Sequence, residues 1–284
     1  MTSFNLPEWS HPHRERVLTC LRNAFTTEES ALHQACLYPI ETGGKRIRPL
    51  FLCAGLEALG VHLTADHDAY IAGASIELIH TYSLVHDDLP CMDNDDFRRG
   101  KPTVHKQYNE GIAVLVGDAL LTKAFEILTS LKTTPAQAVQ LIQLLGKAAG
   151  SVGMIGGQSL DIGFEGTIDS IERLTKLHRR KTGALIAVGL EMAAVLGQAT
   201  PTQQEALHTF GQQIGLAFQL ADDLLDAEED AQEDGPPNFT KLLGEEGTKT
   251  LAEQTMKQAI DSITELPNPS ALLALAEFTV RRNH

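Results

Sequence analysis

The sequence predicts an all-α protein, built as a single large helical bundle around a central cavity. Apolar residues recur at helical spacing along nearly the whole chain, and short β-branched runs with period-two alternation are nearly absent. Two aspartate-rich clusters each lie where a long apolar helical pattern ends. Carboxylates are costly to bury unless they are paired or hold a cation. The clusters therefore indicate a polar cavity inside the bundle.

Bulk composition agrees with a globular chain that has a large core. The 284 residues are 43% hydrophobic and 21% charged. We find no linker rich in Pro, Gly and Ser, so we expect one domain over residues 1–284. The formal net charge of −14 disfavours nucleic acid or an anionic membrane as a partner.

The remaining bulk features predict a cytoplasmic protein. The cysteines show no zinc-type spacing, which favours a reducing compartment; they are Cys20, Cys36, Cys53 and Cys91. Residues 1–16 do not resemble a signal peptide. No uninterrupted apolar stretch reaches the roughly 18 residues that a membrane span needs, so we expect no span.

Turn residues divide the helical pattern into segments. We expect helices near 12–25, 28–38, 48–59, 66–89, 111–131, 135–150, 169–197, 201–230, 248–264 and 268–282. The expected breaks are Gly43-Gly44, Gly60, 99–102, Gly156-Gly157 and 234–237.

The first aspartate cluster ends the apolar stretch 69–85. Asp87 and Asp88 lie at the expected helix end, and Pro90 then breaks the helix so that Asp93 can return towards Asp87. Acidic residues are poor C-caps because their charge opposes the helix macrodipole. A bound cation resolves this conflict, and Mg²⁺ prefers carboxylate ligands together with substrate phosphates.

The second cluster lies on one stripe of an otherwise apolar helix. Gln219, Asp222, Asp223 and Asp226 are spaced i, i+3, i+4 and i+7. Asp222 and Asp226 are one turn apart and can share a metal ion. The alternative is a solvated helix end before the acidic loop 227–240. The presence of two such clusters favours the metal interpretation.

Several cations are candidates for phosphate binding. Arg98 and Arg99 follow the first cluster and suit bidentate phosphate contacts, although ion pairs with Asp95 and Asp96 are an alternative. His80 shares a helix face with Asp87 and could donate to a phosphate, or could be an ordinary core histidine.

Two further segments carry lysines beside glycines. Gly44, Lys45 and Arg48 lie in a loop that could cradle an anion, although it lacks the Walker spacing and could be a solvated turn. Lys181 and Thr182 lie within the expected helix 169–197. Lys181 there needs an anionic partner unless it reaches the surface.

These residues together resemble a known family. The motifs are GGKRIRP at 43–49, DDLPCMD at 87–93, RRGKPTVH at 98–105, GD at 117–118, GGQSLD at 156–161, KTG at 181–183 and FQLADDLLD at 218–226. The chain resembles the trans-isoprenyl diphosphate synthases, or polyprenyl synthetases, and among them the bacterial-type farnesyl diphosphate synthases. The resemblance covers almost the whole chain and implies the isoprenoid synthase fold.

The resemblance also implies roles for individual residues. Three Mg²⁺ ions, for which Mn²⁺ could substitute, would be bound by Asp87, Asp88, Asp93, Asp222, Asp223 and Asp226. The allylic diphosphate or its departing cation would contact Arg98, Lys181, Thr182 and Gln219. Isopentenyl diphosphate would be held by Gly44, Lys45, Arg48, His80 and Arg99. The catalytic set would be Asp87, Asp88, Asp93, Lys181 and Asp222. Arg281 and Arg282 would close over the isopentenyl diphosphate.

The implied reaction is a Mg²⁺-dependent head-to-tail condensation. The allylic C–O bond ionises, the homoallylic double bond attacks the carbocation, and a proton is lost. The substrates would be isopentenyl diphosphate and an allylic diphosphate, and relatives suggest a homodimer. Tyr82, five residues before Asp87, and Ser83 would form the floor that limits chain length. A bulky ring there favours farnesyl diphosphate, whereas a merely packed Tyr82 leaves geranyl or geranylgeranyl diphosphate open.

One departure from the family concerns the loop 227–240. Relatives usually carry lysines there, and this chain has none. That absence leaves open a catalytically weak regulatory subunit, although both intact aspartate clusters argue against it. A terpene cyclase also uses aspartate-rich helices, but it has no need for the GGKRIRP loop.

Overall fold

The computed structural model describes residues 4–26, 30–225 and 237–280. The described chain is helical nearly throughout, which confirms the predicted fold class. Its contacts divide it into two compact units. We call Pro7–Cys53 with Leu63–Ile142 the N-terminal unit, and Met1–Leu6, Ala54–His62 and Gln143–His284 the C-terminal unit. A single domain over 1–284 stays a prediction.

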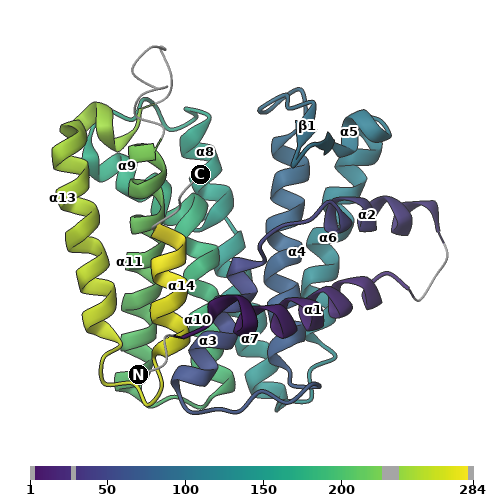
Figure 1. Ribbon diagram of the computed structural model, residues 1–284. Helices are drawn as coiled ribbons and strands as arrows, with labels where there is room; N and C mark the ends of the chain where they lie inside the picture. Colours follow the sequence, from purple (N-terminus) through teal and green to yellow (C-terminus); the bar gives the residue numbers. More distant parts are fainter. Residues whose placement is uncertain (1–3, 27–29, 226–236, 281–284) are drawn as a thin grey trace. The chain divides into compact units, whose positions relative to one another are not determined.

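The N-terminal unit is organised around one buried helix. It contains α1 (Leu6–Asn23), α2 (Ala31–Glu41), the start of α3 (Ile47–Ala58), α4 (Ala69–Asp87), β1 (Phe97–Arg98), β2 (Lys101–Pro102), α5 (Val104–Gln107), α6 (Glu110–Leu128) and the start of α7 (Pro135–Ala149). Helix α4 runs beside α6, and α2 packs on both (Figure 1). Apolar side chains bury α4 on nearly every face, as its continuous apolar sequence predicts.

Helices α4 and α6 approach closely because of one glycine. The imidazole of His86 lies on the backbone of α6, with Nε2 3.1 Å from the carbonyl of Val114. A Cβ at Gly117 would lie 1.9 Å from that Nε2. The end of α4, which carries the first aspartate cluster, is therefore seated against a side-chain-free position of α6.

Strands are nearly absent from the described residues, as predicted, apart from one short hairpin. Phe97 pairs with Pro102 and Arg98 with Lys101 in a two-stranded antiparallel hairpin. Its two central residues, Arg99 (φ 54°) and Gly100 (φ 75°), both have left-handed backbones. Two such residues form the turn that matches the twist of paired strands. The hairpin fixes Arg98 and Arg99 to a defined backbone.

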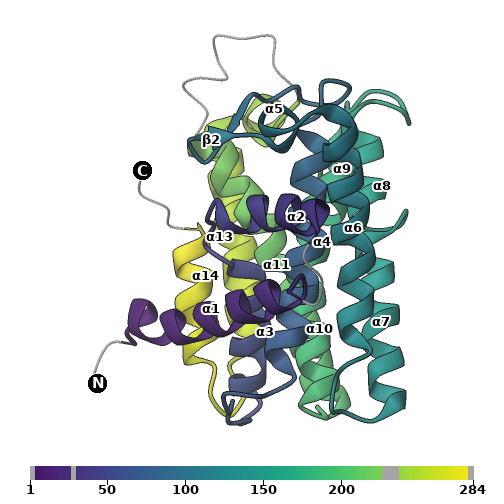
Figure 2. The same cartoon turned by 90° about the vertical axis from the view of Figure 1, so that its right-hand side faces the viewer.

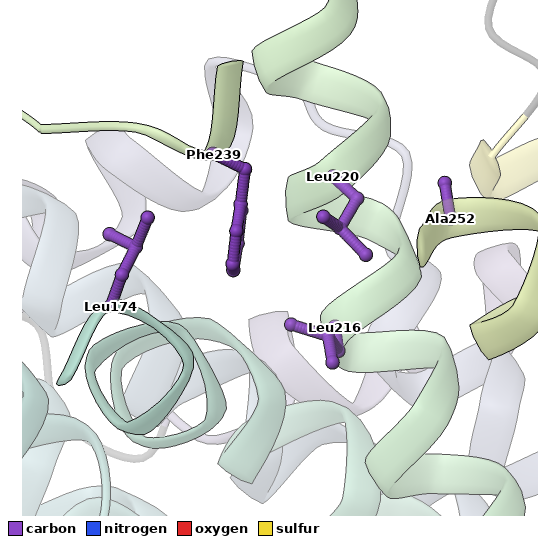
Figure 3. Packing of buried hydrophobic residues seen from close by; sticks show 5 residues of the cluster. All are labelled: Leu174, Leu216, Leu220, Phe239 and Ala252. Carbon is purple, nitrogen blue, oxygen red and sulfur yellow. The ribbon is translucent and has the colours of Figure 1, made fainter. Parts of the chain in front are cut away.

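The C-terminal unit contains the second aspartate cluster. Its helices are α8 (Met154–Asp161), α9 (Ile171–His178), the π-helix η1 (Arg179–Gly183), α10 (Ala184–Leu196), α11 (Pro201–Leu225), α13 (Phe239–Ser262) and α14 (Ser270–Val280), with the end of α3 and of α7. Helix α11 lies between α10 and α13 and packs along both (Figure 2). The ring of Phe239 lies between Leu174 and Leu220 in a cluster with Leu216 and Ala252 (Figure 3).

Several predicted boundaries were wrong in this unit. The expected helix 169–197 is interrupted by η1, and Gly156-Gly157 lies inside α8 instead of forming a break. Helix α13 begins at Phe239, earlier than predicted, because Asn238 caps it by accepting a hydrogen bond from the Lys241 amide at 2.8 Å. A left-handed Gly244 (φ 71°) then kinks it.

One apolar segment has the length and composition of a membrane span. It covers Pro135–Asp161, with a mean hydropathy of 1.3 and 28% of its window buried. The segment is two helices, however, since residues 150–153 separate α7, with 15 residues, from α8, with 8. Neither helix reaches the roughly 20 residues that cross a bilayer. The absence of a span stays a prediction.

Candidate functional site

The first aspartate cluster forms a tight turn at the end of α4. Asp87 is the last residue of the helix and Asp88 is its C-cap. After Pro90 the chain reverses, and the backbone N–H of Asp93 donates to the carbonyl of Asp87 at 2.8 Å. Asp87 is half-buried and Asp93 is exposed. The predicted return of Asp93 towards Asp87 is therefore present.

Asp88 is buried, unlike Asp87 and Asp93, and it forms an ion pair. Its side chain is 4% exposed, and its Oδ1 accepts from Nε of Arg98 at 2.6 Å. Burial raises the pKa of Asp88, while the guanidinium of Arg98 opposes that rise. Arg98 also contacts Asp95 at 3.2 Å, which is the ion pair considered as an alternative to phosphate binding. Asp88 thus holds Arg98 in the turn.

His80, on the same helix, lies in the electrostatic field of several arginines of the N-terminal unit. Burial lowers the pKa of His80 well below its usual value, and the charges of four arginines lower it further: Arg48, Arg99, Arg46 and Arg98. The imidazole is therefore neutral at physiological pH and can donate one N–H and accept at the other nitrogen. Arg46 and Arg98 are paired with Glu77 and Asp88. Arg48 and Arg99 are therefore the guanidiniums that we expect to favour an anion with several oxygens.

The glycine-rich loop lies against Arg99 of the hairpin. Arg99 donates to the carbonyl of Gly43, and a Cβ at Gly44 would lie 2.7 Å from the Arg99 guanidinium. Partial desolvation of the Arg99 guanidinium and the positive charge of Arg46 lower the pKa of Arg99. The structure therefore brings Gly44 and Arg99 together, as predicted. Lys45 is exposed and Arg48 is half-buried beside them in the chain.

Tyr82 is buried one helical turn before the first cluster. Its ring is 5% exposed and packs edge-on against His86, with the ring centroids 5.8 Å apart. Burial and the nearby Asp87 raise the pKa of Tyr82 to about 12. Its hydroxyl is buried and has no hydrogen-bond partner in the part of the chain that the structure describes. Ser83 is half-buried and donates to the His80 carbonyl at 2.9 Å.

The described part of the second aspartate cluster occupies the last turns of α11. Gln219, Asp222 and Asp223 are each half-buried there, as the helical spacing predicts. The Oδ2 of Asp223 accepts from the backbone N–H of Phe239 at 2.7 Å. Asp223 therefore ties the end of α11 to the start of α13. Asp226, most of the loop 227–240, and Arg281 and Arg282 lie outside the described residues.

Lys181 and Thr182 lie in the π-helical turn η1. A π-turn inserts an extra residue into a helix and often marks functional positions. Lys181, with its side chain 30% exposed, forms an ion pair with Asp161 at the end of α8. The predicted need for an anionic partner is thus met within the C-terminal unit. Gln158, on the same helix as Asp161, buries an amide nitrogen that has no partner among the described residues.

The carboxylates suit a metal that is completed by its substrate. Among the described residues, no group of three or more His, Cys, Asp or Glu side chains converges on one point. Mg²⁺ does not require such a cage, since it usually binds one or two carboxylates together with water and phosphate oxygens. The half-buried Asp87 beside the turn to Asp93, and the half-buried Asp222, fit that pattern.

The buried partners of these residues were not predicted from the sequence. Arg46 pairs with Glu77 of α4, and both side chains are buried. Glu77 is the acidic residue inside the apolar stretch 69–85, and that was the available signal, since a buried carboxylate needs a partner. Phe239 and His178 gave no comparable signal, because their contact depends on tertiary packing.

His178 predicts a pH dependence of stability. It precedes η1 and packs against Phe239, with the ring centroids 5.5 Å apart. Burial lowers its pKa to about 4, Asp161 opposes the shift and Lys181 adds to it. As pH falls, His178 therefore becomes protonated in the unfolded chain first, near pH 6.5. The contribution of neutral His178 to the free energy of unfolding is complete above about pH 6.5 and is lost as pH falls towards about 4.

We expect His178→Phe to remove this dependence. Urea unfolding at about pH 7.5 and about pH 5 should show that the variant loses roughly 2 kcal/mol less than the native chain between these values. His62→Phe, at an exposed position, is the control. An identical loss in the native chain and in His178→Phe would contradict the assignment.

The chain matches a family model and curated relatives along most of its length. A family model described as polyprenyl synthetase matches residues 29–256. A farnesyl diphosphate synthase of Geobacillus stearothermophilus is 40% identical over 300 residues, covering 100% of both chains. A chloroplastic geranylgeranyl pyrophosphate synthase of Capsicum annuum is 38% identical over 272 residues, covering 90% of this chain and 73% of that enzyme.

Solved structures give the same result for the fold. An apo FPP/GFPP synthase from Zymomonas mobilis is 38% identical, with a TM-score of 0.89 over 97% of this chain and 99% of that one. A geranyltransferase from Helicobacter pylori, complexed with magnesium and isoprenyl diphosphate, is 34% identical. Its TM-score is 0.85 over 99% of this chain and 100% of that one.

Proposed function

Because the chain belongs to the polyprenyl synthetase family and is a short-chain trans-prenyl diphosphate synthase, we propose that its product is farnesyl diphosphate. It would join isopentenyl diphosphate to dimethylallyl diphosphate and then to geranyl diphosphate, releasing pyrophosphate each time. Both substrates carry a diphosphate, so two anion sites are required.

The observation that carries this proposal is that α4 bears polar groups suited to a diphosphate at two separate positions. Its end bears Asp87, with Asp93 in the turn that follows, and suits a metal-bound diphosphate. Seven residues earlier, or roughly 10 Å at the helical rise, His80 lies in the electrostatic field of Arg48 and Arg99. That position suits a second diphosphate bound by guanidiniums and a neutral imidazole. The relative from Helicobacter pylori, named for its complex with magnesium and isoprenyl diphosphate, supports these ligands.

We assign the aspartates two kinds of role. Asp87, Asp93, Asp222 and Asp226 would bind Mg²⁺ directly, with three ions expected and Mn²⁺ able to substitute. Asp88 is buried against Arg98, and Asp223 accepts from the Phe239 amide; we assign both to positioning the groups around the metals, in place of the metal role that the resemblance implies. When bound, Mg²⁺ supplies Lewis-acid stabilisation of the negative charge on the leaving diphosphate.

The remaining residues would bind substrate and exclude water. Arg98 and Lys181 would hold the allylic diphosphate, while Thr182 and Gln219 would face the carbocation that forms when the allylic C–O bond breaks. Lys45, Arg48, His80 and Arg99, with the Gly44 backbone, would hold isopentenyl diphosphate. Its double bond attacks C1 of the carbocation, and the proton released from C2 passes to pyrophosphate. Water must be excluded, since it would trap the carbocation.

Tyr82 supports a product of fifteen carbons. Its buried ring lies five residues before Asp87, roughly 7.5 Å along the helix axis, where a growing chain would meet it. The curated relatives include geranylgeranyl synthases, which makes a C20 product the second candidate.

Replacing this ring is expected to change the product. Tyr82→Ala should shift the main product from C15 to C20 or longer, because it opens space below the allylic site. Tyr82→Phe is the matched control. It keeps the ring and removes a hydroxyl that lacks a partner among the described residues, so it should keep C15 and stabilise the fold by about 1 kcal/mol. Chromatography of the labelled products measures their chain length. A C15 main product from Tyr82→Ala would contradict the role of Tyr82 in limiting chain length.

The experiment that tests the function is turnover by the isolated chain. Purified protein, Mg²⁺ and labelled isopentenyl diphosphate are incubated with a C5, C10 or C15 allylic diphosphate. A C15 end point supports the proposal, and C20 supports the second candidate. If none of the three primers gives a product, the result would favour a catalytically weak regulatory subunit, in which the loop 227–240 lacks lysines. Consumption of an allylic diphosphate alone would indicate a terpene cyclase.

We also propose a cytoplasmic homodimer. The cysteine spacing supports the compartment, and the resemblance to the family supports the dimer. Sedimentation of the purified chain tests its oligomeric state.

A further inference from the structure

The loop that carries Lys45 has an unusual backbone. Gly43 (φ 100°), Gly44 (φ 132°) and Arg46 (φ 51°) all lie in the left-handed region. Glycine adopts this region readily, but an arginine there is strained by its Cβ. Such a conformation persists only where its surroundings hold it. The loop therefore depends on whatever fixes Arg46.

The side chain of Arg46 is anchored at two points within the N-terminal unit. Its Nη1 lies 2.7 Å from Oε1 of Glu77 on α4, and the two side chains are only 6% and 3% exposed. Its Nη2 donates to the carbonyl of Ile40, near the end of α2, at 2.5 Å. Arg46 thus fastens the loop to α4 and to α2. It is buried in the structure, unlike the adjacent Lys45, which is exposed.

A buried ion pair has two possible explanations here. It could serve stability alone, although such pairs contribute little stability compared with apolar residues of similar volume. It could instead fix a geometry that apolar residues would leave loose. The left-handed backbone at Arg46 favours the second explanation, because the pair sits at the strained residue. Its partner Glu77 is on α4, the helix that also carries His80 and Asp87.

We propose that Glu77 and Arg46 are positioning residues, whose buried ion pair holds the loop so that Lys45 and Arg48 present their charges to the diphosphate of the homoallylic substrate. This inference rests on the proposed function. Neither residue needs to touch the substrate. Glu77 acts on Arg46, and Arg46 acts through the backbone of the loop.

The test replaces the pair without leaving a buried charge. In the double variant Arg46→Met with Glu77→Leu, apolar groups of similar size should preserve the fold, while the loop loses its two anchors. We expect an unchanged or higher Tm and a rise of roughly tenfold or more in both the Kd and the KM for isopentenyl diphosphate. The KM for geranyl diphosphate should stay within about twofold. The exposed pair Asp66 and Lys132, with Nζ 2.7 Å from Oδ2, is the control when both residues become alanine.

A double-mutant cycle with Lys45→Ala tests whether the ion pair acts on substrate binding by positioning Lys45 or through a general effect on the protein. Lys45→Ala should raise the Kd for isopentenyl diphosphate in the native background and have little further effect in the double variant, because the loop no longer presents that lysine. Calorimetric titration measures these values without turnover. Additive effects would overturn the inference, as would an unchanged Kd in a folded double variant.

The inference and the proposed function fail in different ways. If the native chain binds no isopentenyl diphosphate, or if Lys45→Ala leaves its Kd unchanged, the proposed function fails and the inference fails with it. If Lys45→Ala raises the Kd for isopentenyl diphosphate but the double variant keeps the native Kd, only the inference fails. Should the double variant not fold, Glu77→Gln keeps the volume and an acceptor oxygen. A rise in the same Kd would support the inference, and a native Kd would overturn it.

Discussion

Asp87→Asn is expected to lower kcat about 10³-fold, whereas Asp88→Asn is expected to lower it only about tenfold. The difference follows from where each carboxylate lies and from the role that we assign to it. Asp87 ends α4 next to the turn that returns Asp93, and we assign it to a Mg²⁺ ion. Losing a metal that stabilises the leaving diphosphate removes about 4 kcal/mol of transition-state stabilisation.

Asp88 is expected to act through Arg98 instead. The amide oxygen that Asp88→Asn introduces can still accept from Arg98, so the variant loses the charge but keeps the hydrogen bond. The loss of one charge-assisted interaction is worth about 1–2 kcal/mol, or roughly tenfold.

The Mg²⁺ dependence of kcat distinguishes the two roles. Asp87→Asn should raise the Mg²⁺ concentration needed for half-maximal activity, and Asp88→Asn should leave it unchanged. Asp95→Asn is a control in the same turn, since Asp95 forms only a half-exposed contact with Arg98, and it should change kcat by about twofold or less. If Asp87→Asn and Asp88→Asn lowered kcat equally and raised the required Mg²⁺ concentration equally, Asp88 would have to be assigned as a metal ligand.

Gly157→Ala is expected to destabilise the protein by about 3 kcal/mol, lowering Tm by roughly 6–10 °C. A Cβ at position 157 would lie 2.2 Å from the backbone nitrogen of Lys181 and 2.6 Å from its Cα. Both atoms are backbone, so a rotamer change cannot relieve the overlap. Helix α8 or the π-turn η1 must move, and activity should fall with stability because Lys181 moves too.

The control for this substitution is Gly111→Ala in the first turn of α6. A Cβ at Gly111 meets only Oδ1 of Asn109, at 3.4 Å. This variant should be neutral or stabilised by up to about 1 kcal/mol, since alanine favours helix more than glycine does. Thermal unfolding followed by circular dichroism measures both variants. A native Tm for Gly157→Ala would show that α8 and η1 can separate without loss.

Helical periodicity in the sequence did not predict the π-turn η1. The segment 169–197 has a continuous helical pattern, and sequence reasoning predicted one helix. The structure instead forms α9, η1 and α10. One inserted residue is invisible to periodicity, but it is favoured by the close contacts of Gly183 with Gly215 of α11, and of Gly157 with Lys181. These contacts join residues far apart in the sequence.

What the sequence by itself determined is the all-helical class, the two aspartate clusters and the loop with Gly44 and Lys45. Each follows from short-range properties: apolar spacing, turn residues, and carboxylates where the helix macrodipole disfavours them. Only the tertiary structure decided which partners Asp88, Glu77 and Asp223 have. Asp88 and Arg98, Glu77 and Arg46, and Asp223 with the Phe239 amide are joined by packing between separate elements. Pairing of this kind depends on which atoms the fold buries together, because burial makes an unpaired charge costly. Spacing along one helix does not contain that information.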